Sequence, residues 1–257
     1  MKNFTKEKMQ RGERTIGTFF ELASTNAAEA LSYSNLDYII IDTEHGPYSE
    51  DTTQELIRAT KGSRLTSFVR IKEVSRAAVL KMLDIGAEGL IIPCIDTVDQ
   101  VKDLVKWGKY TPVGQRGFFF GRVAGYGFED FTSPLQDYFD LCNRETMIIP
   151  QCETAGSLEN IEEIASIDGV DGIFIGPYDL SIALGAPGEF DTDDFKNAIN
   201  RIIKACEAAN KPVMIYAGGM EAARIFLDMG IDSITYSMDL GVLTNSYIDL
   251  VEKLINY

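Results

Sequence analysis

The sequence is poor in histidine and cysteine. One histidine occurs among 257 residues, so the chain cannot build a zinc site that depends on several histidines. The four cysteines contain no C-x-x-C pair, and the first residues lack the apolar core of a signal peptide. No apolar run approaches the ~18 residues that suggest a membrane span. We therefore expect a cytoplasmic protein with reduced thiols and no membrane partner.

Positive charge is also scarce. There are 24 lysines and arginines against 39 aspartates and glutamates, which gives a formal net charge of -15. This balance argues against nucleic acid as a partner, because phosphate backbones require a basic surface. A small anionic substrate would be repelled at long range and would need a local arginine or a metal ion. The expected partner is a small-molecule substrate.

The hydrophobic pattern alternates between short strands and amphipathic helices along the whole chain. Buried parallel strands are expected at 15–21, 37–42, 66–71, 88–94, 146–152, 171–175, 212–217 and 232–237. Helices are expected at 24–32, 49–60, 75–83, 98–108, 157–165, 192–209, 220–229 and 239–256. Eight strand–helix units without a linker predict a single-domain (β/α)8 TIM barrel of the α/β class over residues 1–257. The alternative is a doubly wound open sheet, which lacks support because no G-x-G-x-x-G follows the first strand.

One long segment interrupts the alternation. Residues 111–127 contain five glycines and a cluster of aromatic side chains. An ordered loop of this length inside a compact domain is usually functional or mobile. The run Phe118, Phe119 and Phe120 could form an oligomer contact, could pack in a core, or could belong to a substrate lid.

The carboxyl ends of the expected strands carry polar and charged side chains. They are Asp42, Glu44, His45, Arg70, Gln151, Glu153 and Asp179. Each of them alone could simply terminate a strand. In a barrel, however, the carboxyl ends of all strands lie on one face, which is where active sites form. Their convergence predicts an active site there.

Glu153 and Asp179 are the candidate metal ligands. Two carboxylates with open positions for water suit a hard divalent ion such as Mg²⁺ or Mn²⁺. The alternative is that each carboxylate only caps the helix that follows it. Gly176 and Pro177 form a turn before Asp179, and the backbone N–H groups of Tyr178 and Asp179 could hold a carboxylate at a helix N-terminus.

Arg70 and His45 are the candidates for polar catalysis. Arg70 has a charge that cannot be titrated away and offers paired donors to a carboxylate or an oxyanion. His45 is the natural proton carrier near neutral pH. Asp42, Glu44 or Asp84 could orient its ring, although Asp84 ends an expected helix and could equally be a surface residue.

Several motifs together resemble the HpcH/HpaI aldolase family of metal-dependent class II pyruvate aldolases. They are DTEHGP at 42–47, VRI at 69–71, LDIGAEGLIIP at 83–93, RG at 116–117, QCET at 151–154 and GPYDLS at 176–181. The resemblance runs in order from about Gly17 to Leu243. Cys152 departs from the aliphatic residue more usual at its position. YAGGM at 216–220 also departs from the family pattern, which leaves the aldehyde pocket undefined.

The resemblance implies a divalent-metal-dependent aldolase, a carbon–carbon lyase. It would cleave a 4-hydroxy-2-oxo acid reversibly into pyruvate and an aldehyde through a metal-stabilised pyruvate enolate. The acid would be a 2-keto-3-deoxy sugar acid or a 4-hydroxy-2-oxo diacid, with succinic semialdehyde, tartronate semialdehyde, glyoxylate or lactaldehyde as the aldehyde. Glu153 and Asp179 would bind Mg²⁺ or Mn²⁺, with Co²⁺ as a further option.

The resemblance also implies roles for individual residues. Arg70 would lie beside the enolate oxygen, and His45 would pair with Asp84 as the acid/base unit. Contacts to the bound oxo acid would come from Arg70, Gln151, Gly176, Tyr178 and Asp179. Members of the family form homo-oligomers, here expected to be a hexamer or a trimer. The apolar stripe along the expected helix 239–256 would then pack on a neighbouring subunit.

Three other functions stay open at this point. A class I aldolase would form a Schiff base on a lysine, and Lys72 is the only lysine close to a strand end. A lyase acting on malyl- or citryl-CoA thioesters belongs to the wider family, although the chain shows no basic tract for the CoA phosphates. A non-catalytic barrel used for binding would not need a tight divalent-metal site.

Overall fold

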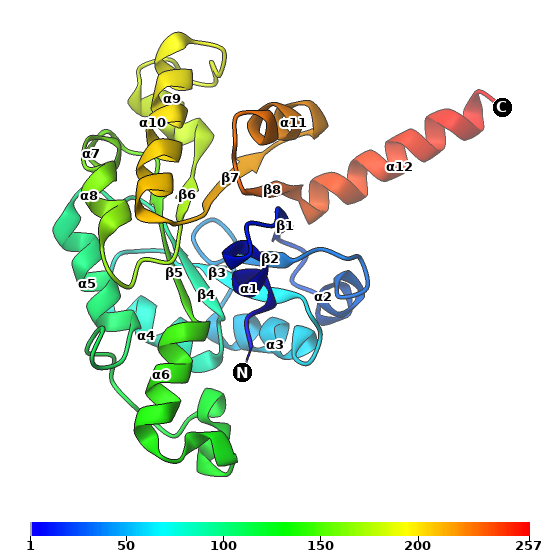
Figure 1. Cartoon of the computed structure of the whole chain (residues 1–257). Helices are drawn as coiled ribbons and strands as arrows, with labels where there is room; N and C mark the ends of the chain where they lie inside the picture. The colour runs from blue at the N-terminus through cyan, green and yellow to red at the C-terminus, as the bar shows by residue number, and fades with distance from the viewer. Residues whose placement is uncertain (1) are drawn as a thin grey trace.

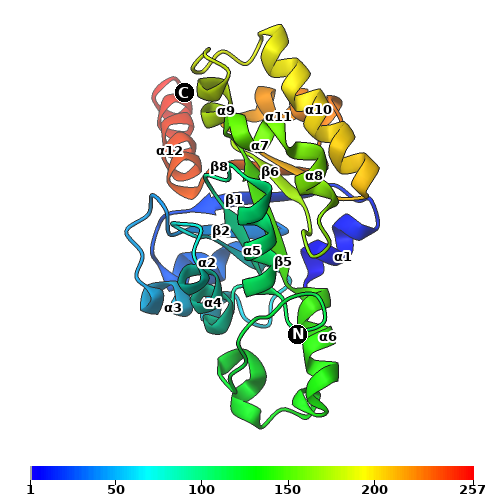
Figure 2. The ribbon, with the colours of Figure 1, turned by 90° about the vertical axis from the view of Figure 1, so that its left-hand side faces the viewer.

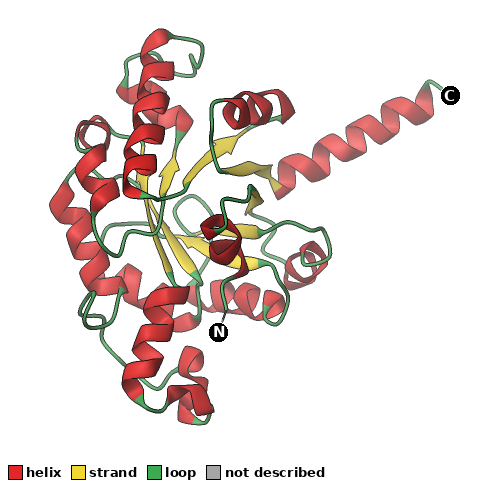
Figure 3. Cartoon of the chain, in the orientation of Figure 1, coloured by secondary structure: helices red, strands yellow, loops and turns green. Residues whose placement is uncertain are grey.

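The computed structural model describes residues 2–257 and shows a closed barrel of eight parallel strands. Each strand is hydrogen-bonded to its neighbours in chain order, and β1 closes the ring against β8. The strands are β1 (Thr15–Phe20), β2 (Tyr38–Asp42), β3 (Thr66–Arg70), β4 (Gly89–Ile92), β5 (Met147–Cys152), β6 (Ile173–Ile175), β7 (Val213–Ala217) and β8 (Ser233–Met238). Helices cover the outside of this ring (Figure 1, Figure 3). The predicted (β/α)8 barrel is confirmed.

The helices lie between and after the strands, and most of them occur where the apolar pattern predicts a helix. They are α1 (Phe4–Gln10), α2 (Thr25–Leu31), α3 (Glu50–Thr60), α4 (Arg76–Ile85), α5 (Val98–Gly108), α6 (Leu135–Glu145), α7 (Ala155–Glu159), α8 (Ile161–Ser166), α9 (Pro177–Ala183), α10 (Asp193–Ala209), α11 (Met220–Asp228) and α12 (Asp239–Ile255), with short 3-10 helices η1 (Arg122–Gly127) and η2 (Asp130–Thr132). Helices α1 and α6 were not predicted, and α9 was indicated only by Tyr178 and Asp179 at its start. The predicted helix 157–165 is instead split at Asn160, which leaves helical geometry at φ -104° and ψ 15°.

Strand side chains alternate between the barrel interior and the layer beneath the helices. On β2, Tyr38 and Ile40 belong to the interior cluster, whereas Ile39 and Ile41 pack outward against the helices. This period of two carries the next residue, Asp42, to the interior side at the mouth of the barrel. Asp42 is 2% exposed there, so the alternation both builds the core and delivers a carboxylate to the mouth.

The same alternation places further polar side chains at the mouth. The interior cluster includes Phe19, Phe68, Ile149 and Met214, each from a different strand. The residues two positions further along those strands are Glu21, Arg70, Gln151 and Tyr216. Because the strands are parallel, all of these positions lie at the same end of the barrel.

Helix α1 closes the opposite, amino-terminal end. In Figure 1 it lies across the middle of the strand ring. Its Met9 joins the interior cluster, and the hydroxyl of Thr5 donates to the carbonyl of Asp37 at 2.8 Å. Asn3 caps the helix by accepting the N–H of Lys6 at 2.9 Å. The amino-terminal end is therefore plugged, and the carboxyl end is the one that remains open to a ligand.

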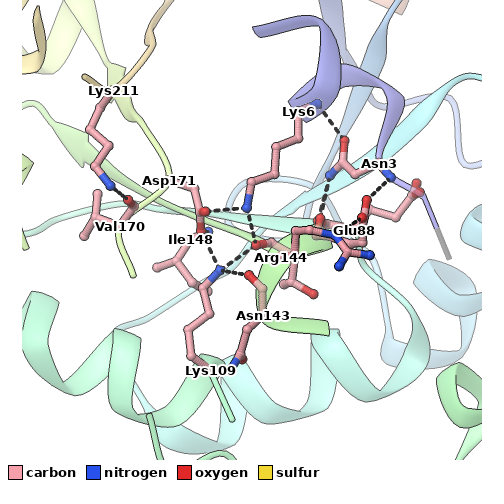
Figure 4. Close-up of polar contacts among 12 residues, drawn as sticks. Asn3, Lys6, Glu88, Lys109, Asn143, Arg144, Ile148, Val170, Asp171 and Lys211 are labelled. Carbon is pink, nitrogen blue, oxygen red and sulfur yellow. Dashed lines mark hydrogen bonds and ion pairs between the residues drawn. The ribbon is translucent and has the colours of Figure 1, made fainter. Parts of the chain in front are cut away.

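A buried charge network ties this plug to the barrel (Figure 4). Lys109, which follows α5, has its Nζ 2.7 Å from Asp171 and donates to the carbonyls of Asn143 and Thr146. The other oxygen of Asp171 lies 2.6 Å from the Nζ of Lys6 in α1. Burial lowers the pKa of Lys109 to about 8, while Asp171 opposes that shift. The network links α1, α5 and the start of β6.

The long segment 111–127 lies at the amino-terminal end, beside α6 (Figure 2). It follows α5, which runs back from the mouth, and Arg122 donates to the carbonyl of Ile85 at the end of α4. Phe118 packs among Tyr110, Tyr138 and Phe139. The lid interpretation is therefore wrong for this chain's own barrel mouth, because the segment covers the other end.

Helix α12 projects away from the barrel (Figure 1). Only Asp239, its first residue, is buried. Its exposed apolar side chains are Leu240, Val242, Leu243, Tyr247, Ile248, Leu250, Val251, Leu254 and Ile255. Within residues 2–257, no helix has both the length and the apolar character that a membrane span needs.

Replacing Lys109 with methionine tests the buried network. The change leaves Asp171 with one cation fewer, the carbonyl of Asn143 without its donor and that of Thr146 with only the longer contact to Lys6, so we expect the free energy of unfolding to fall by about 3–5 kcal/mol. Urea denaturation measures this loss. Lys106, exposed on the same helix, provides the control, and Lys106→Met should change stability by less than about 0.5 kcal/mol. Equal effects of the two substitutions would contradict the role given to the network.

Candidate active site

A cavity of about 490 Å³ opens at the carboxyl end of the barrel. Its lining combines an apolar wall with a set of carboxylates. The lining residues are Phe19, Glu21, Asp42, His45, Arg70, Gln151, Glu153, Phe174, Gly176, Pro177, Tyr178, Asp179, Tyr216, Met238 and Leu240. Most of the predicted site residues meet here. Glu44 and Asp84 are the two that do not line the cavity, and among the lining residues Arg70 is the one permanent cation.

Arg70 is held in place by its neighbours on β2 and β3. The register of these strands sets Asp42 directly beside Arg70. Arg70 donates through Nε to Asp42 Oδ1 at 2.8 Å and through Nη2 to Asp42 Oδ2, and its Nε lies 3.3 Å from Glu44 Oε2. The guanidinium also stacks 4.7 Å above the ring centre of Phe19. The cation thus has one fixed orientation in the cavity.

The carboxylates keep Arg70 charged. Burial alone would lower its pKa, but the hydrogen bonds and charges of Asp42, followed by the charge of Glu44, raise the pKa above its usual value. Burial raises the pKa of Glu44, and the charge of Arg70 opposes that rise. The guanidinium can therefore act as a permanent hydrogen-bond donor to an oxyanion.

Glu153 is a buried carboxylate with neutral hydrogen-bond partners. Its Oε1 accepts the backbone N–H of Cys94 at 2.7 Å, and its Oε2 accepts Nε2 of Gln151 at 2.6 Å. Glu153 is 5% exposed. Burial raises its pKa to about 7, and the nearby charges of Asp179 and Glu44 add to the rise. A cation that binds beside Glu153 would therefore stabilise its ionised form.

The surroundings of Glu153 fit a divalent metal ion. A Cβ on Gly176 would lie 2.3 Å from Glu153 Oε2, so only glycine leaves room for the carboxylate. Gln151 Oε1 is buried and has no hydrogen-bond partner within residues 2–257. Oxygen donors of this kind suit Mg²⁺ or Mn²⁺. Residues 2–257 contain no cluster of three or more histidine, cysteine or acidic side chains able to hold a metal, so Glu153 and Asp179 could supply only part of a coordination shell.

His45 stands at the rim of the cavity. Its side chain is 72% exposed, and its Nε2 lies 3.9 Å from Glu44 Oε2. Asp42 is committed to Arg70, so it does not orient the imidazole as the sequence suggested it could. Glu44 is the acid nearest to His45 in this chain.

Asp84 lies away from His45. It sits near the end of α4, where Arg116 Nη2 donates to its Oδ1 at 2.8 Å. Helix α4 returns to the amino-terminal end of the barrel, whereas His45 follows β2 at the carboxyl end. A pair between these two side chains could therefore form only between two chains. Lys72 is exposed and is not among the cavity-lining residues.

Glu21 lines the cavity although it was not among the residues expected at the site. It follows β1. Burial raises its pKa to about 7, with further contributions from the charge and hydrogen bond of Asp42. The signal was present, because Glu21 ends a predicted strand two positions after Phe19, on the same side of that strand.

We predict that Gly176→Ala weakens Mn²⁺ binding by at least about tenfold, because the added methyl group displaces the Glu153 carboxylate without removing a ligand. Titration calorimetry with Mn²⁺ measures the affinity. The matched control is Gly219→Ala, since a Cβ on Gly219 meets nothing within 4 Å. If both variants bind Mn²⁺ as the parent protein does, the metal does not sit against Glu153.

Comparison with known proteins agrees with this geometry. The family model for HpcH/HpaI aldolase/citrate lyase matches residues 15–246. The chain is 32% identical to a 5-keto-4-deoxy-D-glucarate aldolase of Enterobacter sp., over 98% of this chain and 96% of that relative. It is 31% identical to a 2-keto-3-deoxy-L-rhamnonate aldolase of Klebsiella pneumoniae, over 96% and 91% of the two chains.

A solved structure supports the same conclusion. An HpcH/HpaI aldolase/citrate lyase family protein from Burkholderia cenocepacia superposes with a TM-score of 0.89 at 30% identity, covering 98% of this chain and 99% of that one. The chain belongs to the HpcH/HpaI aldolase/citrate lyase family, and the names of its relatives indicate a lyase of the aldolase type.

Proposed function

We propose that this chain is a divalent-metal-dependent aldolase that reversibly cleaves a 4-hydroxy-2-oxo acid into pyruvate and an aldehyde. The observation that carries the proposal is the meeting of Glu153, Asp179 and a fixed Arg70 in one cavity. Two carboxylates suited to a hard cation, with a guanidinium beside them, match the charge that appears when a 2-oxo acid becomes an enolate.

The metal site would consist of Glu153 and Asp179. A divalent ion bound there supplies Lewis-acid stabilisation of the negative charge that develops during carbon–carbon cleavage. Gln151 holds Glu153 in position through its Nε2, and its Oε1 has no hydrogen-bond partner among the residues that the structure describes. Helix α9 begins at Pro177, which has no N–H group. The backbone N–H groups of Tyr178 and Asp179 would therefore be the donors for the substrate carboxylate.

Arg70 would stabilise the enolate oxygen. Asp42 uses the Nε proton and one Nη2 proton, so the two Nη1 protons and the second Nη2 proton are the donors left for the substrate. In cleavage the C4 hydroxyl loses its proton, the C3–C4 bond breaks, and its electron pair forms the enolate of pyruvate. Protonation at C3 then completes pyruvate, and the former C4 leaves as the aldehyde.

His45 would carry the proton of the C4 hydroxyl. Its position at the rim suits a group that meets the aldehyde half of the substrate rather than the pyruvate half. The pairing of His45 with Asp84 requires a second chain, because the two residues lie at opposite ends of one barrel. We therefore infer a homo-oligomer in which the amino-terminal end of one subunit reaches the barrel mouth of another.

Helix α12 supports the same inference. In the single chain the apolar side chains along α12 are exposed to solvent. A large exposed apolar surface usually packs against a partner. We propose that residues 239–255 pack on a neighbouring subunit. A hexamer or a trimer is the assembly expected from the family.

The central test is pyruvate release from a panel of 4-hydroxy-2-oxo and 2-oxo-3-deoxy acids, coupled to lactate dehydrogenase. We expect release with Mg²⁺ or Mn²⁺ and its loss with EDTA. Release that survives EDTA, together with borohydride trapping of pyruvate on the protein, would instead indicate a Schiff base on Lys72. The absence of release from every acid would contradict the proposed aldolase and favour the thioester lyase or the binding protein.

Replacing His45 with alanine separates proton transfer from metal binding. We expect kcat for cleavage to fall by about 10²–10⁴, because a positioned acid/base contributes that much. Mn²⁺ affinity, measured by calorimetry on the same protein, should stay within about twofold, since the ring lies at the rim. A parallel loss of metal affinity would show that His45 belongs to the metal site instead.

A charged substitution on α12 tests the assembly. Leu250→Glu places a charge on the exposed apolar stripe and should shift the protein toward a smaller species with lower activity. Size-exclusion chromatography with light scattering measures the mass of the assembly. Asn245→Glu adds the same charge to the same helix at a polar position and serves as the control. An unchanged mass for Leu250→Glu would remove α12 from the interface.

A further inference from the structure

Glu21 lies across the barrel mouth from the carboxylates assigned to the metal. In a ring of eight strands in chain order, β1 is opposite β5, and Glu153 follows β5. Glu21 follows β1 and shares its side of the cavity with Met238 and Leu240, which come from the end of β8 and the start of α12. If the pyruvate half occupies the side of Glu153, the aldehyde half must extend toward Glu21.

The chain around Glu21 is fixed from two sides. Asp239 accepts the backbone N–H of Glu21 at 2.9 Å and that of Leu22 at 3.0 Å. The hydroxyl of Tyr48 accepts the N–H of Ala23 and lies within hydrogen-bonding distance of the carbonyl of Phe20, both at 3.2 Å. The backbone is therefore held before, at and after Glu21. Its side chain is presented to the cavity by a rigid turn.

Arg70 is the one permanent cation among the cavity-lining residues, and its charge acts on the carboxyl group of Glu21. Arg70 is already engaged with Asp42 and Glu44. The Oε2 atom of Glu21 is 3.1 Å from where a Cβ on Gly46 would stand, so this oxygen lies against the loop that carries His45. Glu21 therefore lines the same cavity as His45, the residue proposed to meet the C4 hydroxyl and the aldehyde half.

The chemistry of this corner favours a hydroxyl group and opposes a second carboxylate. Burial and the adjacent Asp42 raise the pKa of Glu21 to about 7, so near neutral pH the group exists in both protonation states. A protonated carboxyl group can donate to a hydroxyl oxygen, and an ionised one can accept its proton. A carboxylate on the aldehyde half would instead meet the negative charges of Glu21 and Asp42, while Arg70 is engaged by Asp42, Glu44 and the enolate oxygen.

We propose that Glu21 is a specificity-determining residue that hydrogen-bonds a hydroxyl group on the aldehyde half of the substrate, so that the enzyme prefers neutral hydroxyaldehydes to aldehydes that carry a carboxylate. The inference rests on the proposed aldolase function and names the substrate class of that same cavity. The substrates named for two relatives differ in this respect. A keto-deoxy-rhamnonate carries one carboxylate and a keto-deoxy-glucarate carries two, so the proposal favours a substrate of the first kind.

Aldol synthesis from pyruvate and three small aldehydes tests the proposal. Glycolaldehyde replaces one methyl hydrogen of acetaldehyde with a hydroxyl group, and glyoxylate replaces the methyl group with a carboxylate. The values of kcat/KM are measured with Mn²⁺ for the parent protein and for Glu21→Ala, Glu21→Gln and Glu29→Gln. Glu29 is an exposed acid on α2, so its variant controls for loss of one negative charge.

The outcome is decided by the ratios of kcat/KM between aldehydes, because a general loss of activity lowers all three values equally and leaves their ratios unchanged. In Glu21→Ala we expect the glycolaldehyde-to-acetaldehyde ratio to fall about tenfold and the glyoxylate-to-acetaldehyde ratio to rise at least about threefold. Glu21→Gln should keep part of the hydroxyl preference while it shows the same gain with glyoxylate. This variant also supplies the ratios if Glu21→Ala does not fold.

Ratios in both Glu21 variants within twofold of the parent values would overturn the proposal. So would a parent enzyme that prefers glyoxylate and loses that preference in Glu21→Ala. Failure of the aldolase function is recognised separately by metal-dependent exchange of the methyl protons of pyruvate in D₂O, which needs no aldehyde. A parent protein with neither exchange nor synthesis would overturn the function and the inference together.

Discussion

The bidentate pairing of Asp42 with Arg70 is the interaction on which the rest of the active site depends. The register of β2 and β3 sets the two residues side by side, and their alternation along the strands turns both side chains into the barrel mouth. The pair fixes the guanidinium and engages both oxygens of Asp42, and Oδ1 also accepts the backbone N–H of Glu44 at 3.1 Å. As a consequence Asp42 cannot orient His45, and Glu21 adjoins an acid whose charge is already committed.

The two ends of the barrel treat buried charge differently. At the amino-terminal end, Asp171 meets Lys6 and Lys109, and the remaining protons of Lys109 go to backbone carbonyls. At the carboxyl end, Glu153 accepts hydrogen bonds from neutral donors, and the charge of Arg70 opposes only part of the effect of burial on its pKa. The first arrangement stabilises the fold. In the second, a cation that binds beside Glu153 relieves the cost of burying its charge. This asymmetry explains why only the carboxyl end is suited to chemistry.

Most of the fold could be predicted because its signals are local. Apolar runs that end abruptly at Asp42 or Arg70 mark both a strand and a residue at the barrel mouth. Helix α6 has apolar residues at helical spacing, but the glycine- and aromatic-rich segment before it obscured its start. The pairing of Asp42 with Arg70 depends on the register of β2 and β3. The separation of Asp84 from His45 depends on the direction in which α4 runs. Neither property is visible in a short stretch of sequence.

The most direct measurement is the anomalous scattering of Mn²⁺ in crystals grown with Mn²⁺ and pyruvate. The geometry predicts one ion bonded to a carboxylate oxygen of Glu153 and one of Asp179, with pyruvate bound between that ion and Arg70. An ion bound elsewhere, or pyruvate bound with no ion at these carboxylates, would contradict the assignment of this cavity as a metal-dependent aldolase site.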